Sequence, residues 1–126
     1  MTNVKSYTDL QQSKKLAEIL PLESADMLFQ LGENKYADSI RVPLTKKHWE
    51  QMMHDINPCW SLAALLNVLP NSIYDNTNEF SQLEFTKKSV AYIHRTTGDI
   101  KIGTLKDNLI DTCYEMVLKL HELKLL

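Results

Sequence analysis

Residues 58–70 constrain the fold most, because they are almost entirely apolar and carry a proline at each end. Ser61 can cap a helix there by accepting a hydrogen bond from a free backbone N–H of the first turn, and the closing proline stops that helix. Leucines recur at helical spacing and share one face, at Leu62, Leu65, Leu66 and Leu69. With Trp60 they are predicted to form a buried joint between the two halves of the chain.

The size and composition indicate one intracellular domain. A chain of 126 residues can bury its own core. Its 14 basic and 16 acidic side chains nearly balance, so no positive field attracts a nucleic acid. The two cysteines form no CxxC pair, no apolar leader is seen, and no apolar run could cross a bilayer. We therefore expect a cytoplasmic single domain over residues 1–126, partly disordered at 1–7, with no membrane contact.

A helix and a β-hairpin are predicted for the first third of the chain. Thr8 or Asp9 can cap a helix that ends before Pro21. Residues 27–31 are apolar and residues 39–43 alternate between apolar and polar, so we interpret them as the two strands of the hairpin. A short apolar run also fits a buried helix, which stays open as the alternative.

A second helix is predicted over residues 46–56, where apolar side chains recur at helical spacing. Asn57 and Pro58 break it, and the central helix at 61–69 follows almost at once, so a close helix pair is expected. Residues 71–81 are polar and rich in asparagine, and are interpreted as a loop.

The clearest pattern lies in the C-terminal half. Residues 83–85, 89–94 and 100–104 alternate between apolar and polar side chains, with turns between the runs, and predict a three-stranded antiparallel meander. Apolar residues then recur at steps of one, three and four over 109–123, which predicts a long helix.

The predicted fold class is therefore α+β. A small antiparallel β-meander packs against the central helix and the long C-terminal helix, and the N-terminal helix completes the domain. Thr104 begins a weak variant of the capping box for the last helix, and Asp107 is an alternative cap.

Three groups of residues are candidates for chemistry. Cys59 precedes the central helix, whose dipole can lower the pKa of a thiol, but a nucleophile also needs a base. His54 is a further candidate, although nothing local identifies it as that base. Asp107 and Asp111 are four residues apart on one helical face, and could hold a cation or act as an acid–base pair. For each group the structural interpretation is favoured, with Cys59 buried beside Trp60 and the aspartates stabilising the helix dipole.

The histidines form no metal-binding motif, because no two stand four residues apart on one helix; they are His48, His54, His94 and His121. We therefore predict no metal, no cofactor and no catalytic residue. Cys113 falls on the apolar stripe of the last helix and is expected in the core.

Basic residues occur mainly as doublets, which could merge into a patch for a phosphate backbone. Tyr92 with Lys87 and Lys88 nearby suggests a surface on which bases could stack. The negative net charge and the missing recognition motif favour solvated surfaces instead. A nucleic acid is thus a disfavoured partner.

Several segments spread over nearly the whole chain carry a resemblance to one family. They are residues 12–16, 24–27, 59–66, 69–70 and 108–116, in this order. Together they resemble a family of small uncharacterised proteins from Bacteroides-type gut bacteria and from the phages and integrated elements of these bacteria. The resemblance implies a bacterial or phage origin and cytoplasmic expression. It carries over no functional residue, because no activity is attached to the family.

The expected function is that of a non-enzymatic accessory or protein-interaction protein, encoded by a phage or mobile element. A homodimer could bury the apolar end of the chain, which comprises Leu120, Leu123, Leu125 and Leu126. The alternative is a small enzyme or ligand-binding domain that uses Cys59, His54 or Asp107 with Asp111, which would have to converge on one pocket. A nucleic-acid binder is the third option.

Overall fold

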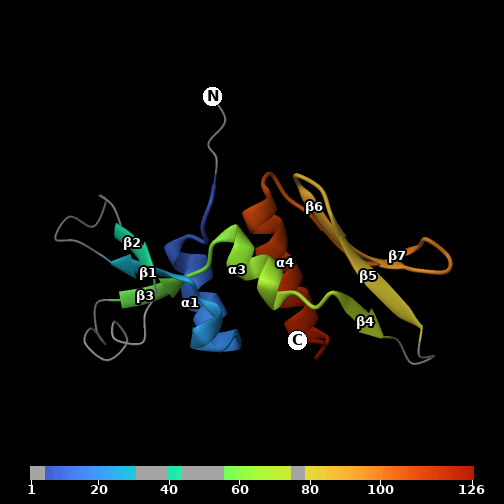
Figure 1. Cartoon of the computed structure of the whole chain (residues 1–126), viewed down its shortest axis with the longest axis horizontal. Helices are drawn as coiled ribbons and strands as arrows, with labels where there is room; N and C mark the ends of the chain where they lie inside the picture. Colours follow the sequence, from blue (N-terminus) through green and yellow to red (C-terminus); the bar gives the residue numbers. More distant parts are fainter. Residues whose placement is uncertain (1–4, 31–39, 44–55, 75–78) are drawn as a thin grey trace. The chain divides into compact units, whose positions relative to one another are not determined.

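The computed structural model describes residues 5–30, 40–43, 56–74 and 79–126 (Figure 1). The chain divides into two compact units. One is Ser6–Ala64, and the other combines Lys5 with Leu65–Leu126. Each unit is described by itself, and a single domain over residues 1–126 stays a prediction.

Helix α1, Leu10–Ile19, belongs to the unit Ser6–Ala64. Its N-terminus is a reciprocal capping box, because the Gln12 N–H donates to the Asp9 carboxylate at 2.8 Å and the Asp9 N–H donates to the Gln12 side-chain oxygen at 3.1 Å. The 3₁₀ turn η1, Leu22–Ser24, follows after Pro21. The predicted helix, capped at Asp9 and ended before Pro21, is confirmed.

The same unit contains a three-stranded antiparallel sheet in the order β2-β1-β3. Its strands are β1, Met27–Gln30; β2, Ile40–Pro43; and β3, Ile56–Cys59. Met27 lies opposite Pro43 and Gln30 lies opposite Ile40, which confirms the predicted hairpin.

Strand β3 corrects the prediction of a helix that is broken at Asn57 and Pro58. Ile56 lies opposite Gln30 in the sheet, and both supposed breakers belong to the strand. Proline is tolerated here because β3 is an edge strand, where one side of the backbone needs no partner. Residues 46–55 of the predicted helix lie outside the described residues.

Trp60 anchors the core of this unit, with no exposed surface. The Trp60 N–H donates to the Thr8 hydroxyl at 3.0 Å, and the Thr8 N–H donates to the Trp60 carbonyl at 3.0 Å. The indole N–H of Trp60 donates to the Ser24 hydroxyl at 3.0 Å. A buried polar network of this kind fixes one arrangement of the side chains.

Helix α3, Leu62–Val68, is the predicted central helix. The Ala64 N–H donates to the Ser61 hydroxyl oxygen at 3.2 Å, so Ser61 caps it as expected. Leu65 and Leu69 are buried, but Leu62 and Leu66 are only half-buried. The buried stripe is therefore narrower than the spacing predicted.

The unit with Leu65–Leu126 contains a four-stranded antiparallel sheet in the order β4-β5-β6-β7. Its strands are β4, Ser72–Tyr74; β5, Phe80–Phe85; β6, Ser89–His94; and β7, Ile100–Leu105. The three predicted strands are confirmed. The predicted loop at 71–81 is wrong at β4 and at the start of β5, since Tyr74 lies opposite Phe80 with ring centroids 5.8 Å apart.

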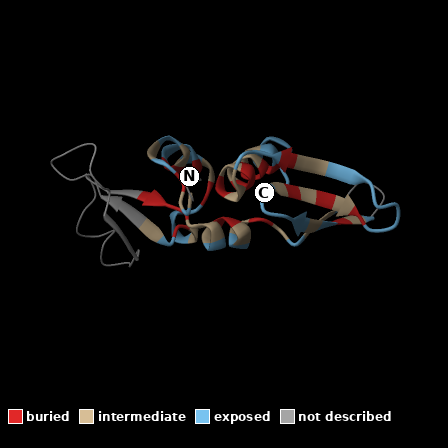
Figure 2. Cartoon of the chain, turned by 90° about the horizontal axis from the view of Figure 1, so that it is seen from above, coloured by how far each residue is buried: buried red, intermediate tan, exposed pale blue. Residues whose placement is uncertain are grey.

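Helix α4, Leu109–Glu122, packs on β6 and β7. Buried and half-buried residues alternate along β6 (Figure 2). Because side chains alternate between the two faces of a strand, the buried ones share one face, and α4 packs on β6. The N-cap is Asn108, whose side-chain oxygen accepts the Asp111 N–H at 2.8 Å. Thr104 and Asp107 are therefore wrong as caps, because Thr104 lies in β7 and Asp107 precedes the cap. The α+β class is confirmed.

Candidate functional site

One face of the four-stranded sheet is covered by α4. The Thr104 hydroxyl donates to the Thr112 carbonyl at 2.9 Å, and the Thr112 hydroxyl donates to the Lys88 carbonyl at 2.6 Å. Val90 lies opposite Thr104 in the sheet and is fully buried, as is Tyr92 on the same face. This face is the core of the unit.

The opposite face is open. Side chains alternate between the faces of a strand, so Ser89, Ala91 and Ile93 point away from α4. The sheet places Leu105 opposite Ser89, Gly103 opposite Ala91 and Ile100 opposite Ile93. Ala91 and Gly103 therefore form the middle of this face. Around them lie large apolar residues and the charged Glu84, which lies opposite Ala91 in β5.

This arrangement leaves a hollow of about 630 Å³, which we call the open hollow. Its lining includes Ala91, Gly103, Ile93, Ile100 and Leu105. Ile100 is 67% exposed and Leu105 is 71% exposed, which is unusual for large apolar side chains in a sheet. The open hollow is thus an apolar surface that no described part of the chain covers.

Gly103 allows close packing beside the open hollow. A Cβ atom at this position would lie 3.2 Å from Cγ2 of Ile100, which is tighter than ordinary van der Waals contact. Glycine therefore lets Ile100 lie close over the backbone of β7.

The outer edge of β7 carries backbone groups that do not bond to β6. The Lys106 N–H donates to the Lys88 carbonyl at 3.3 Å, so Lys88 and Lys106 form a hydrogen-bonded pair. Such pairs alternate with non-bonded pairs along antiparallel strands, so Val90 and Thr104, two residues further, form a hydrogen-bonded pair as well. Gly103 and Leu105 lie between these positions, and their N–H and C=O groups point away from β6.

Lys119 reaches this edge from α4, where its Nζ donates to the Gly103 carbonyl at 3.1 Å. A second depression of about 410 Å³, the edge recess, follows the same edge. It is lined by Lys101, Ile102, Gly103, Lys119, Glu122 and Leu123. Strand β7 is thus the edge strand of the sheet, and it lines both the open hollow and the edge recess.

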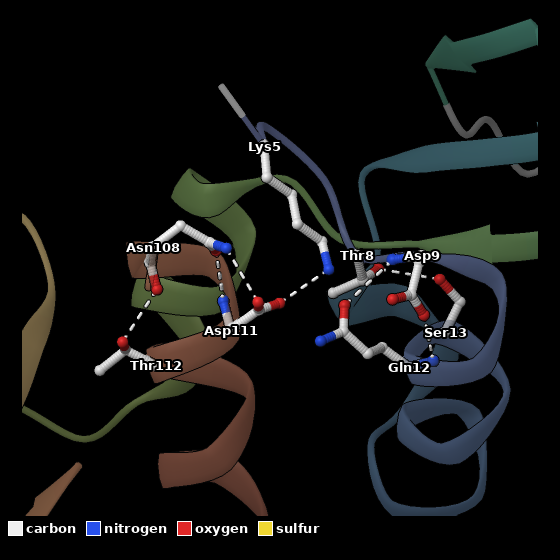
Figure 3. A network of polar contacts seen from close by, with 8 residues as sticks. All are labelled: Lys5, Thr8, Asp9, Gln12, Ser13, Asn108, Asp111 and Thr112. Atoms are coloured by element: carbon white, nitrogen blue, oxygen red, sulfur yellow. Dashed lines mark hydrogen bonds and ion pairs between the residues drawn. The ribbon is translucent and has the colours of Figure 1, made fainter. Parts of the chain in front are cut away.

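The predicted carboxylate pair is not formed. Asp107 precedes the helix and is exposed, so it shares no helical face with Asp111. The Asp111 carboxylate instead accepts hydrogen bonds from Lys5 Nζ at 2.7 Å and from Asn108 Nδ2 at 2.8 Å (Figure 3). Asp111 therefore ties the start of α4 to Lys5.

The candidate cysteine Cys59 is fully buried and lies opposite Met27 in the first sheet. Like Asp107 and Asp111, it does not line the open hollow. His54 lies outside the described residues. The described candidates therefore do not meet in the open hollow.

The stacking surface at Tyr92, which was the disfavoured alternative, is not formed. Tyr92 has no exposed surface, and its hydroxyl donates to the Pro70 carbonyl at 2.7 Å. Burial, followed by the nearby Cys113, raises the pKa of Tyr92 above its ordinary value. A buried ring cannot stack on a base.

His94 is a buried polar residue that the sequence interpretation missed. Its Nδ1 accepts the Thr97 N–H at 3.2 Å, and its Nε2 donates to a Glu79 carboxylate oxygen at 2.5 Å. The alternation of β6 was the available signal, because His94 is two residues beyond the buried Tyr92.

Comparison with protein-family models, curated proteins and solved structures found no match to this chain. Within the described ranges, no group of three or more histidine, cysteine, aspartate or glutamate side chains could hold a metal ion. No helix in the described part combines the length and the apolar content needed to cross a membrane.

Cys113 lies in the core as expected, and burial raises the pKa of its thiol from 9.0 to about 12. At pH 9 an ordinary thiol is about half ionised, whereas Cys113 stays protonated and inaccessible. We expect iodoacetamide at this pH to leave Cys113 unmodified in the folded protein and to alkylate it in urea, as measured by peptide mass spectrometry. Rapid alkylation of the folded protein would contradict its placement.

Proposed function

We propose that this chain is a non-enzymatic accessory protein that acts by binding another protein chain through the open face of its four-stranded sheet. The resemblance to proteins of Bacteroides-type bacteria and their phages suggests that it serves a phage or integrated element. The open hollow supports the proposal most directly, because Ile100 and Leu105 expose apolar surface that a bound chain would remove from water.

A bound protein fits the open hollow better than a small substrate does. Its volume of about 630 Å³ lies within the range of small-molecule sites. Such sites, however, enclose most of the ligand and present several convergent polar groups. Here the surface is open, and Glu84 is the one charged side chain among the described residues of its lining, whereas Ile93, Ile100 and Leu105 are apolar.

The alternative of a small enzyme gains no support from the positions of its candidate residues. Cys59 is enclosed, and Asp111 is held by Lys5 and Asn108. Asp107 is exposed outside the helix. A catalytic group must reach its substrate in a shared cavity, and these groups do not line the open hollow.

The test uses a tagged chain that is immobilised and exposed to a lysate of host bacteria to which untagged copies of the chain have been added. Ala91→Lys places a long charged side chain in the open hollow. Glu18→Lys is the matched control, because Glu18 is 71% exposed on α1 and also becomes lysine. Circular dichroism verifies that both variants are folded.

We expect the wild-type chain and the Glu18→Lys variant to retain the same protein, and the Ala91→Lys variant to lose it. Equal retention by Ala91→Lys, or no retained protein with the wild-type chain, would contradict the proposed function. The retained protein is identified by mass spectrometry, which separates an added copy of the chain from a different protein.

A further inference from the structure

We infer that the chain bound at this surface is a second copy, paired antiparallel along the outer edge of β7 with Thr104 on the two-fold axis. In this register Gly103 of each copy lies opposite Leu105 of the other. The inference rests on the proposed function and names its partner.

The outer edge of β7 has backbone N–H and C=O groups that can pair with a second strand. Gly103 and Leu105 direct their N–H and C=O groups away from β6, so two antiparallel copies can exchange N–H···O=C bonds at both positions. Thr104, between them, already bonds inward to β6. A two-fold axis at Thr104 therefore uses both outward-facing residues of each copy, and the two four-stranded sheets become one continuous sheet.

The side chains are complementary in the same register. Leu105 is 71% exposed on the open face, and Gly103 on that face has no side chain. Residues directly opposite each other in antiparallel strands lie side by side on one face. Leu105 of each copy thus occupies the space above Gly103 of the other, at the margin of its open hollow and beside Ile100.

The charges at the ends of β7 also match. Counting outward from Thr104, Ile102 comes opposite Lys106 of the second copy. Lys101, at the register shift of β7, then comes near Asp107, which follows the end of the strand. Glu122 lines the edge recess together with Ile102, so it can meet that lysine. Lys101, Lys106 and Asp107 are exposed. The two-fold axis repeats each pairing of opposite charges.

Another register gives a poorer fit. If Gly103 lay opposite Gly103 of the second copy, Leu105 would face the charged Lys101. The two central glycines would then leave no large side chain to enter the open hollow between them. The register around Thr104 is therefore the one that the side chains favour.

Lys119 competes with the second copy for the Gly103 carbonyl. Its ammonium group donates to the Gly103 carbonyl in the single chain, so it competes with the Leu105 N–H of the second copy for the same oxygen. The contact of Lys119 is exposed, so its loss costs little. A lysine at a sheet edge also limits uncontrolled strand addition, so the dimer forms reversibly.

Paired cysteines test the register. Lys101→Cys with Asp107→Cys places two exposed thiols near each other across the two copies, within the reach of a disulfide. Within one chain Lys101 and Lys106, which still pairs with Lys88, stand about 16 Å apart at about 3.3 Å per residue. Asp107, one residue further, therefore stays beyond the reach of a disulfide to Lys101, so the two thiols can link only different chains. The controls are each single variant, the wild-type chain with its two buried cysteines, and Lys101→Cys with Leu105→Cys.

Under mild oxidation we expect the Lys101→Cys, Asp107→Cys variant to give about tenfold more covalent dimer than either single variant, as seen by non-reducing electrophoresis. Equal dimer from the single variants would overturn the inference. More covalent dimer from Lys101→Cys with Leu105→Cys would indicate the other register and would overturn it as well.

Light scattering of the wild-type chain completes the test. A mass that rises with concentration from the 14.6 kDa of one chain towards twice that value is the expected result. A constant mass of one chain at millimolar concentration would overturn the inference. If the lysate experiment then still retained a different protein through the open hollow, the proposed function would stand without the second copy.

Discussion

Replacing Trp60 with alanine is expected to lower the free energy of unfolding by about 3–5 kcal/mol, the usual cost of truncating a buried aromatic side chain. Trp60 has no exposed surface, and its indole N–H donates to the Ser24 hydroxyl at 3.0 Å. The measurement is urea unfolding followed by far-UV circular dichroism.

Trp60→Phe is the matched control, because it keeps an aromatic ring and removes the indole hydrogen bond. One neutral hydrogen bond contributes about 0.5–1.5 kcal/mol, so this variant should lose much less stability than Trp60→Ala unless the smaller ring leaves a large cavity. A loss below about 1 kcal/mol for Trp60→Ala would contradict its central place in the unit Ser6–Ala64.

Leu65→Ala is expected to cost about 2–5 kcal/mol, whereas Leu66→Ala is expected to cost about 1 kcal/mol. The two leucines are neighbours in α3, but Leu65 is fully buried and Leu66 is only half-buried. Because both variants remove the same atoms from the same helix, their difference reports burial rather than helix propensity. Urea unfolding of the two proteins measures it.

Equal losses for Leu65→Ala and Leu66→Ala would show that the whole apolar face of α3 is buried, as the sequence spacing alone suggests. A larger loss for Leu66→Ala would mean that the face is turned the other way. Either result would contradict the burial seen in this structure.

Elements with strong local signals could be predicted from the sequence. The capped helices α1 and α3 follow from apolar spacing and from prolines near their ends, and the long helix α4 follows from apolar spacing alone. Alternation also identified β5, β6 and β7. In each case neighbouring residues carry the information.

Elements that depend on distant partners were missed. Strand β3 contains Asn57 and Pro58, which locally favour a break, and it forms because β1 offers a free edge. Strand β4 has only 3 residues and gains its structure from β5. Asn108 was overlooked as a cap because Thr104 and Asp107 nearby carry capping side chains too.

The open hollow could be predicted only in part from the sequence. Regular alternation puts Ile100 and Leu105, five residues apart, on opposite faces of β7. The register shift between Tyr92 and Ile93 brings both to the open hollow. Which face α4 covers depends on contacts such as the one from Thr104 to Thr112, eight residues apart. The expected dimer surface at the chain end remains a prediction, although Leu123 does line the edge recess beside β7.

Amide hydrogen exchange at β7 tests the interaction surface most directly. The N–H groups of Gly103 and Leu105 point away from β6, whereas those of Ile102 and Thr104 point towards it. We predict that exchange at Gly103 and Leu105 slows as the protein concentration rises, while Ile102 and Thr104 stay protected throughout. Rapid exchange at Gly103 and Leu105 at every concentration would contradict a second copy paired along this edge.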